Sequence, residues 1–432
     1  IIEYMRGVYV LLLISLFGYA GRVGGQESVT ITQCYEWARA NYPQIHQMGL
    51  IDQTERYSLS NVGKAWLPQL SVSGKASYQS DVTKLPFDGD KISSLLPGFE
   101  IPSLSKDQYQ VVAQVDQTIW DGGSARSARA LTRAEATANR EQLESELYAL
   151  NDRVNQLYFG CLLQDELIRQ NALLQKELQV NIERIEAMME NGVANQSDLE
   201  SMEVELLNAR QNEIELKASR TVYRQMLATF INKPLTDQVV LKTPESPERS
   251  LSTQINRPEL RALDAKSEWI ETQNKQVTAG LMPRIGAFVQ GGYGRPGLNM
   301  LEDSFEPYYV AGVRLSWNLG KLYTLKNDRR KIEVSRRQID VQRETFLFNT
   351  RLQLLRQNTE IKKMTDLMRA DDDIIRLRTS IKQAAEVKLE NGVISVTDLI
   401  REINAEDMAR QTAAAHRVQR LMTIYNYMYT TN

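Results

Sequence analysis

The 432-residue sequence predicts a mixed fold, in which a few very long helices accompany four strands long enough to cross a membrane. Proline and glycine are rare over two long stretches, four segments alternate apolar and polar residues, and the two halves of the chain repeat one order of motifs. The net charge of −2 lacks the basic excess typical of nucleic-acid binders, so no nucleic acid is expected as a partner.

The long helices are predicted from missing turn residues. Residues 103–233 and 308–432 contain no proline and few glycines. Turns use these residues and helix interiors exclude them. Apolar residues from Leu143 onward recur at alternating steps of three and four, the heptad spacing of coiled-coil helices. Helices over 122–189 and 321–390 would each extend roughly 100 Å. Charged runs on them, such as Asp371-Asp372-Asp373, are interpreted as solvated faces.

Four strands are predicted at 69–80, 108–120, 284–293 and 309–318, where apolar and polar residues alternate. Each run is about 10 to 12 residues, the length of a tilted transmembrane strand. If each pair forms a hairpin, the aromatics fall at two levels typical of membrane interfaces. These are Trp66, Trp120 and Trp317 near the helices, and Tyr78, Tyr109, Tyr293 and Tyr309 at the opposite ends. A soluble sandwich with aromatic core residues is the alternative.

Four strands are too few to close a membrane barrel, for which about eight is the practical minimum. Several copies of the chain would therefore have to contribute strands to one barrel.

The N-terminal residues 1–25 are predicted to be a signal peptide, because Arg6 precedes an apolar run followed by small residues. Lipid attachment at Cys34 is a weak alternative, since the residues before it form a poor lipobox. Cys34 and Cys161 are expected to be buried packing residues. His46 and His416 stand far apart without ligand-spaced neighbours, so no metal and no cofactor are expected.

The two halves repeat each other in order. Residues 26–232 form a first repeat, 233–256 a connector and 257–432 a second repeat, each repeat predicted as helix, two strands, long helix and helix. An Asn-Gly-Val turn followed by Asp-Leu occurs in both, at an offset of 200 residues. Gly192 and Gly392 suit a left-handed helix end, and Asp198 and Asp398 suit the first turn of the next helix.

The chain resembles the TolC family of outer-membrane efflux proteins along essentially its whole mature length. The resemblance is carried by the ordered duplication, by the strand exits Trp120-Asp121-Gly122-Gly123 and Trp317-Asn318-Leu319-Gly320, and by the two Gly-x-x-[Ser/Asn]-x-x-Asp-Leu turns. The second strand exit departs from the usual Asp-Gly-Gly pattern. The resemblance implies a homotrimer in which each chain gives four strands to a 12-stranded barrel, continued by an α-helical coiled-coil tunnel.

The resemblance also implies the partners: a periplasmic adaptor (membrane fusion protein), an inner-membrane transporter and outer-membrane lipid. The docking tips would be Gly192, Val193, Asp198, Gly392 and Val393. The gate residue at the periplasmic entrance would be Asp398. Arg401 stands where relatives can carry a further acidic residue, so the acidity of this gate is in question.

The function implied is that of an outer-membrane exit channel, extending into the periplasm and passively conducting substrate from adaptor and pump. No enzyme is expected, because no set of residues resembles a nucleophile, a base or a nucleotide cradle. Gly291-Gly292-Tyr293-Gly294 is glycine-rich but lacks the following helix with Lys-Ser/Thr, so it is interpreted as a strand end. The alternative is a soluble periplasmic coiled-coil scaffold or adaptor protein.

Overall fold

The computed structural model describes residues 28–83, 104–246, 252–300 and 302–432, so the predicted signal peptide lies outside the described residues. The chain divides into two compact units. Of the described residues, the first unit contains 28–45, 143–246, 252–258 and 346–432, and the second contains 46–83, 104–142, 259–300 and 302–345. None of the described helices has the length and hydropathy needed to cross a membrane.

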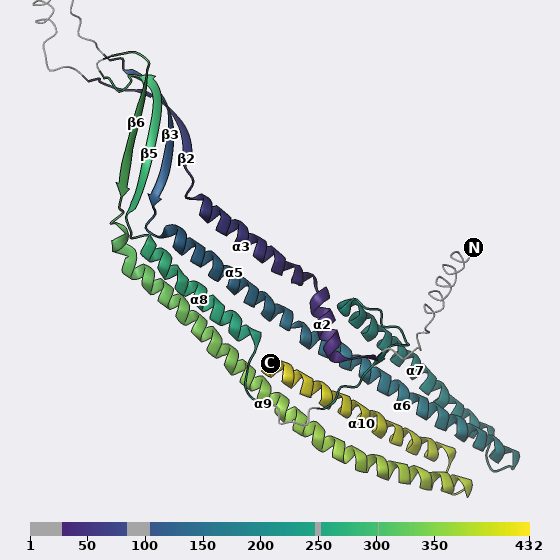
Figure 1. The fold of residues 1–432 in the computed structure, drawn as a ribbon. Coiled ribbons are helices and arrows are strands. Elements are labelled where there is room, and N and C mark those ends of the chain that lie inside the picture. The colour runs from purple at the N-terminus through teal and green to yellow at the C-terminus, as the bar shows by residue number, and fades with distance from the viewer. Residues whose placement is uncertain (1–27, 84–103, 247–251, 301) are drawn as a thin grey trace, which may run out of the picture. The chain divides into compact units, whose positions relative to one another are not determined.

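The second unit contains a four-stranded antiparallel sheet in the order β2-β3-β5-β6 (Figure 1). Its strands are β2 (Gln69–Tyr78), β3 (Asp107–Trp120), β5 (Arg284–Arg295) and β6 (Glu306–Ser316). The expected strands are present and pair as the expected hairpins. Helices α3 (Gln47–Lys64) and α8 (Pro258–Ala279) precede the two hairpins along the chain.

Helix α5 (Ser124–Tyr148) and the longer helix α9 (Lys321–Glu390) each contribute residues to both units. Helix α9 spans 70 residues without a break, as expected. The expected helix over 122–189 is instead two helices, α5 (Ser124–Tyr148) and α6 (Leu150–Glu190). The interruption at Ala149 involves neither proline nor glycine, and the Ala149 N–H still donates to the Ser145 carbonyl at 3.3 Å. Ala149 keeps helical dihedrals, with φ −61° and ψ −17°, so the hydrogen bonding continues across the interruption and no local residue signal marks the place.

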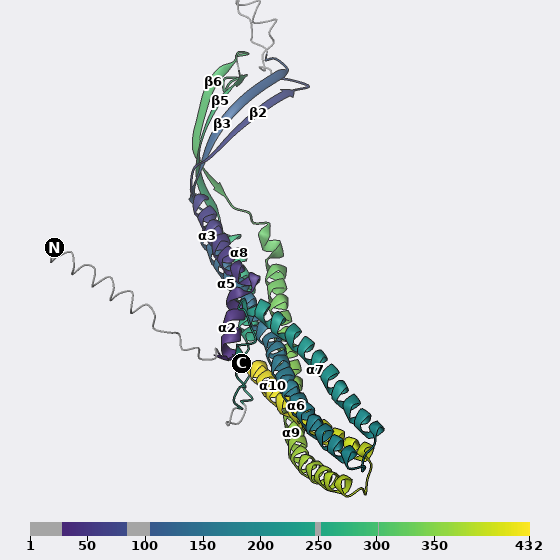
Figure 2. The same ribbon diagram turned by 90° about the vertical axis from the view of Figure 1, so that its right-hand side faces the viewer.

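The first unit is built on two helical hairpins, α6 with α7 (Gln196–Ile231) and α9 with α10 (Val396–Thr431) (Figure 2). Helix α2 (Ile31–Asn41) packs on α6 and α7, and a 3-10 turn follows it at Pro43–His46. Cys34 and Cys161 are fully buried free thiols in the core shared by these helices, as expected.

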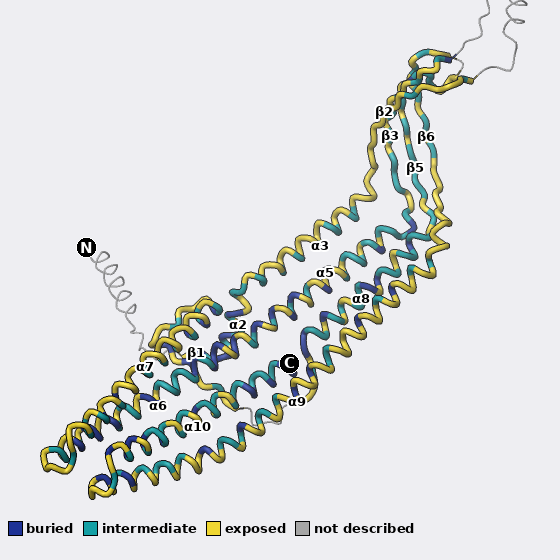
Figure 3. The backbone as a smooth tube through the Cα atoms, turned by 180° about the vertical axis from the view of Figure 1, so that it is seen from behind, coloured by how far each residue is buried: buried dark blue, intermediate teal, exposed yellow. Residues whose placement is uncertain are grey.

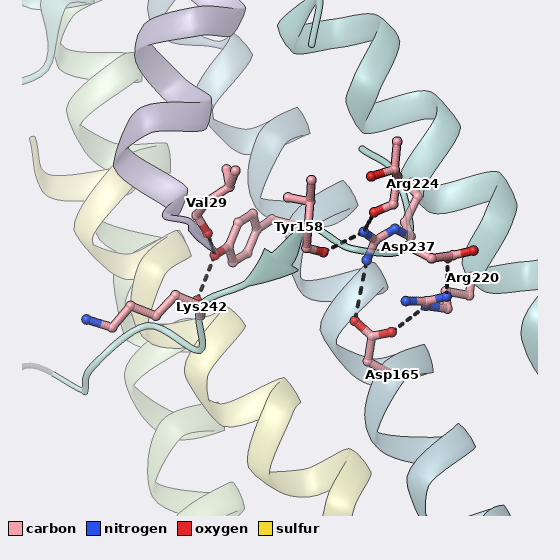
Figure 4. Close-up of polar contacts among 9 residues, drawn as sticks. Val29, Tyr158, Asp165, Arg220, Arg224, Asp237 and Lys242 are labelled. Carbon is pink, nitrogen blue, oxygen red and sulfur yellow. Dashed lines mark hydrogen bonds and ion pairs between the residues drawn. The ribbon is translucent and has the colours of Figure 1, made fainter. Parts of the chain in front are cut away.

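A small parallel pair of strands, β1 (Ser28–Val29) and β4 (Val240–Leu241), lies beside this core. The Tyr158 hydroxyl lies 2.8 Å from the carbonyl oxygen of Val29 in β1 and 2.7 Å from that of Lys242, the residue after β4 (Figure 4). The buried Arg224 guanidinium donates to the carbonyls of Thr236 and Val239 at 2.6 and 2.7 Å. The expected connector thus contains a strand held by side chains of α6 and α7.

One charged run differs from its interpretation as a solvated face. Asp371 is only 7% exposed, and its carboxylate lies 2.7 Å from Nδ1 of His416 on α10. The partner stands 45 residues away in sequence, so local charge density could not reveal the pairing. Within the described part of the chain, no three potential ligands lie together to hold a metal ion.

Candidate functional site

The four-stranded sheet has one continuous apolar face, because its register aligns the alternation of all strands. Leu70, Val115, Val289 and Ala311 form one cross-strand row. The next row, on the other face, is Ser71, Gln114, Gln290 and Val310. The apolar side chains are exposed rather than packed: Leu70 is 72% exposed and Val289 is 55% exposed. We call the two sides the apolar face and the polar face.

Charges follow the same division. Lys75, Asp116, Arg284 and Arg314 share the polar face through the register. On the apolar face of the described strands, the only charged side chains are Asp107 and Arg295. They lie at the ends of β3 and β5 that continue into the loop of each hairpin, opposite the ends that continue toward helices. An exposed surface that is apolar across four strands and charged only at its margin is typical of contact with lipid.

The predicted interface aromatics lie at the two ends of the strands. Trp66, Trp120 and Trp317 stand next to the helices along the chain, at 38%, 41% and 59% exposure. Tyr78, Tyr109, Tyr293 and Tyr309 lie toward the other ends, and all four are exposed. Phe305, which the sequence interpretation missed, stacks on Tyr293 and Tyr109 with ring centroids 5.6 and 6.4 Å apart. The role of the seven predicted aromatic residues at a membrane interface stays a prediction.

The turn between α6 and α7 ends one helix and caps the next. Gly192 has a φ of +71°, and a Cβ added there would meet no atom within 4 Å, so backbone conformation rather than crowding requires glycine. The Val193 N–H donates to the Met188 carbonyl at 2.9 Å, as in a helix-ending Schellman motif. Asn195 and Asp198 then form a reciprocal capping box.

The turn between α9 and α10 has the same construction, with Gly392 at a φ of +66° and a capping box of Ser395 and Asp398. Val193 and Val393 leave their side chains 56% and 68% exposed at these two turns. In Figure 3 the tube at both turns has mainly the yellow of exposed residues. Two apolar side chains held in solvent by capped turns are suited to contact a partner, and their docking role stays a prediction.

Both turns rest on one apolar cluster from four helices. It joins Ile185 of α6, Met202 of α7, Leu389 of α9 and Leu399 of α10, each at most 3% exposed. Because all four helices share this core, the two turns are held together within the first unit. The predicted docking residues are thus brought to one end of a common bundle.

The predicted gate residue, Asp398, is engaged locally. Its carboxylate accepts hydrogen bonds from the Ser395 hydroxyl at 2.8 Å and backbone N–H at 3.2 Å, and lies 3.3 Å from the Arg401 guanidinium. The Ser395 hydrogen bonds, with Arg401, lower the pKa of Asp398 below its usual range. The carboxylate stays ionised, but its charge is partly compensated.

A buried ionic cluster behind the turns was missed by the sequence interpretation. Glu406 of α10 is 2% exposed, and Lys382 of α9 reaches it at 2.7 Å and also pairs with Glu177 of α6. Arg410 and Thr379 complete the hydrogen bonds to Glu406, each at 2.5 Å. Burial by itself raises the pKa of Glu406, but these hydrogen bonds outweigh it and lower the pKa to about 2. The cluster ties the two hairpins together electrostatically.

Residues 34–233 match the family model described as outer membrane efflux protein. Over this segment, 200 of the 432 residues, the sequence is similar to outer membrane efflux proteins. The match confirms the predicted relationship to TolC-type efflux proteins and the predicted location in the bacterial outer membrane, extending into the periplasm.

The fold is similar to those of solved outer-membrane proteins. CusC, described with transmembrane channel formation, matches with a TM-score of 0.66 and 13% identity, covering 93% of this chain and 92% of that chain. The MtrE outer membrane channel of Neisseria gonorrhoeae matches with a TM-score of 0.64 and 14% identity, covering 93% and 88%. VceC of Vibrio cholerae matches with a TM-score of 0.62 and 12% identity, covering 92% and 95%. No curated protein sequence matches the chain significantly.

These similarities establish a mostly helical efflux-protein fold with one strand-rich portion. At such low identities they extend to the fold alone. The residues of the turns, the sheet faces and the ionic cluster are interpreted from their own geometry.

Proposed function

We propose that the protein is the outer-membrane exit channel of a tripartite efflux or secretion system. Substrate would pass through it passively, with energy supplied by an inner-membrane transporter and delivery by a periplasmic adaptor. The observation that supports this most is the sheet, whose exposed apolar face carries charge only at its outer margin while its other face is polar. Such a sheet suits a wall with lipid on one side and water on the other.

The membrane portion would be a barrel completed by three copies of the chain, each giving four strands. Among the described strands, β2 pairs only with β3 and β6 pairs only with β5, so each has an edge of unpaired backbone groups. In hydrocarbon such groups must find partners, because no water is available there. Pairing β6 of one copy with β2 of the next satisfies both edges and makes the 12-stranded barrel. The two repeats of each chain, 26–232 and 257–432, then supply one hairpin each.

The tips and the entrance are assigned in the same proposal. The turns carrying Val193 and Val393 dock the adaptor, and Asp398 lines the entrance that opens when the hairpins move. In this proposal the protein acts as a conduit and not as an enzyme.

Membrane extraction tests the proposal. The full chain, expressed with its export signal, should require detergent for release and should run as a heat-modifiable trimer that conducts ions in planar bilayers. A monomer released by salt or osmotic shock, without bilayer conductance, would contradict the channel and favour a periplasmic coiled-coil scaffold or adaptor.

A further inference from the structure

The polar face of the sheet is hollowed where β3, β5 and β6 lie next to the start of α5 and the end of α3. The cavity has a volume of about 460 Å³. Its lining includes Trp66, Asp116, Arg284, Phe288 and Arg314. All of these residues belong to the unit that contains the sheet, so the cavity is a feature of that unit alone.

Two glycines on the polar face leave this space open. Gly286 pairs directly with Arg314, so no side chain stands opposite the arginine. Gly312 pairs with Phe288, and a Cβ added at Gly312 would lie 3.1 Å from the Phe288 ring. The ring therefore extends over the glycine, and the Arg314 guanidinium lies over the ring at 4.8 Å from its centroid. This cation–π contact presents the guanidinium in a fixed orientation.

The cavity holds two guanidinium groups on neighbouring strands. Arg284 pairs with Ser316 and Arg314 pairs with Gly286, which makes the two arginines diagonal neighbours on one face. Over the described residues, neither forms an ion pair with a carboxylate. Arg284 donates one hydrogen bond to the Ser124 hydroxyl at 3.1 Å, and most of its donors stay free. Like charges at this spacing repel, so the pair is suited to a site that an anion neutralises.

The two carboxylates that line the cavity, those of Asp116 and Asp121, form hydrogen bonds with groups other than the two arginines. Asp121 accepts the backbone N–H groups of Gly123 and Ala125, at 2.8 and 2.5 Å, and so caps α5. Asp116 accepts both of its hydrogen bonds from the Gln114 amide, at 2.9 and 2.7 Å. Neither of these hydrogen-bond sets uses a guanidinium donor, so the donors of Arg314 and most of those of Arg284 remain available to a ligand.

We propose that this cavity is a binding site for organic anions, specifically carboxylates with an aromatic body. The carboxylate would receive paired hydrogen bonds from the Arg314 and Arg284 forks, and the aromatic part would contact Phe288 and Trp66. The inference rests on the proposed channel for its place on the water-filled wall. It gives that wall a preference for anionic cargo.

The binding test uses the purified full chain in an uncharged detergent and follows 4-(trifluoromethyl)benzoate by ¹⁹F line broadening. Saturable broadening is expected with the wild-type protein and not with the neutral 4-(trifluoromethyl)benzamide. Arg314→Gln and Arg284→Gln should each weaken the affinity about tenfold, and Arg314→Lys should lie between, because it keeps the charge and loses the fork. Lys75→Gln removes another cation from the polar face outside the cavity lining and should leave the affinity unchanged.

The site is overturned if the wild-type protein shows no saturable binding, or if the Arg314 and Arg284 variants bind as it does while remaining heat-modifiable. Should one arginine variant fail to fold, the other carries the comparison. Bilayer conductance separates this outcome from failure of the channel: conduction without arginine-dependent binding removes the site alone, and binding without conduction removes the channel alone.

Discussion

Asp398 is less available as a free charge than its place in the sequence suggests. Arg401, one helical turn later, lies 3.3 Å from its carboxylate and is itself 69% exposed. In a symmetric ring of three copies, each acid would thus bring its own partly compensating cation. The two residues should therefore have opposite effects on any cation held at the entrance.

For the entrance, we expect Asp398→Asn to weaken cation block of the bilayer conductance and Arg401→Gln to strengthen it. Removing the acid removes the attraction, whereas removing the arginine uncovers it, and each effect should be severalfold at low salt, where screening is weak. Block by a multivalent cation added from the periplasmic side is the measurement. Equal block in both variants and the wild type would remove Asp398 from the gate.

The pKa of Asp407, next to the buried Glu406, is shifted in the opposite direction to the pKa of Asp398. Burial raises its pKa, and the charges of Glu177 and Glu406 raise it further despite a hydrogen bond from Gln411, to about 6. Because the pKa in the unfolded chain is near 3.8, the contribution of Asp407 to stability is fully present below pH 3.8 and is lost as pH rises through 6. Asp407 therefore destabilises the bundle at neutral pH.

The variant Asp407→Asn should raise the unfolding temperature at pH 7.5, by an amount equivalent to about 1 to 2 kcal/mol per chain. The advantage over the wild type should shrink at pH 5, where the wild-type carboxyl is mostly protonated. Thermal melts of both proteins at the two pH values give the comparison. An advantage independent of pH would show that ionisation of Asp407 does not matter to stability.

Gly392 and Gly49 both have room for a Cβ atom, but only Gly392 has a backbone conformation that favours glycine. Gly392 ends α9 at a φ of +66°, whereas Gly49 lies inside α3, and an added Cβ at either would meet no atom within 4 Å. Alanine at 392 should destabilise the turn by about 1 to 2 kcal/mol through backbone strain. Alanine at 49 should stabilise its helix by up to about 1 kcal/mol. Amide hydrogen exchange should accelerate around the turn in Gly392→Ala and slow in α3 in Gly49→Ala; slower exchange in both would contradict the strained turn.

The exposed valines of the two turns offer a direct test of docking. Val193→Glu together with Val393→Glu should reduce cross-linking to the adaptor about tenfold or more, since a charge would be buried in an apolar contact. The matched pair Val193→Ile and Val393→Ile keeps the surface apolar and should preserve cross-linking. Trimers should persist in both, because these side chains lie outside the shared core. Undiminished cross-linking of the glutamate pair would place the docking surface elsewhere.

Elements with a local pattern were predictable, and elements made by distant partners were not. The strands followed from alternation and the turns from glycine followed by a capping residue, both of which are short-range effects. The two-residue strand β4 depends on β1, about 200 residues earlier, and carries no period of its own. The ionic cluster of Glu177, Lys382 and Glu406 joins three helices, so each residue by itself resembled a solvated charge. Ala149 gave no signal at all.

For the assembled molecule, the two sheet faces make a prediction that neighbouring residues can separate. Val72 and Ser73 lie midway along β2 on opposite faces, Val72 being 69% exposed on the apolar one. An arginine facing lipid near the bilayer midplane destabilises a barrel by about 2 to 4 kcal/mol, and a trimer would bear this three times. An arginine facing water within the barrel keeps its hydration.

Val72→Arg should therefore abolish the heat-modifiable trimer in the outer-membrane fraction, whereas Ser73→Arg should leave the trimer intact and shift bilayer selectivity toward anions. The second variant controls for the size and charge of arginine in the same strand, one residue away. Immunoblots of unheated membrane fractions measure assembly, and reversal potentials in a salt gradient measure selectivity. Trimers lost equally from both variants would mean that the sheet does not separate lipid from water. Trimers retained with Val72→Arg would place the lipid on another surface, and the closure of β2 against β6 of the next copy would have to be abandoned with it.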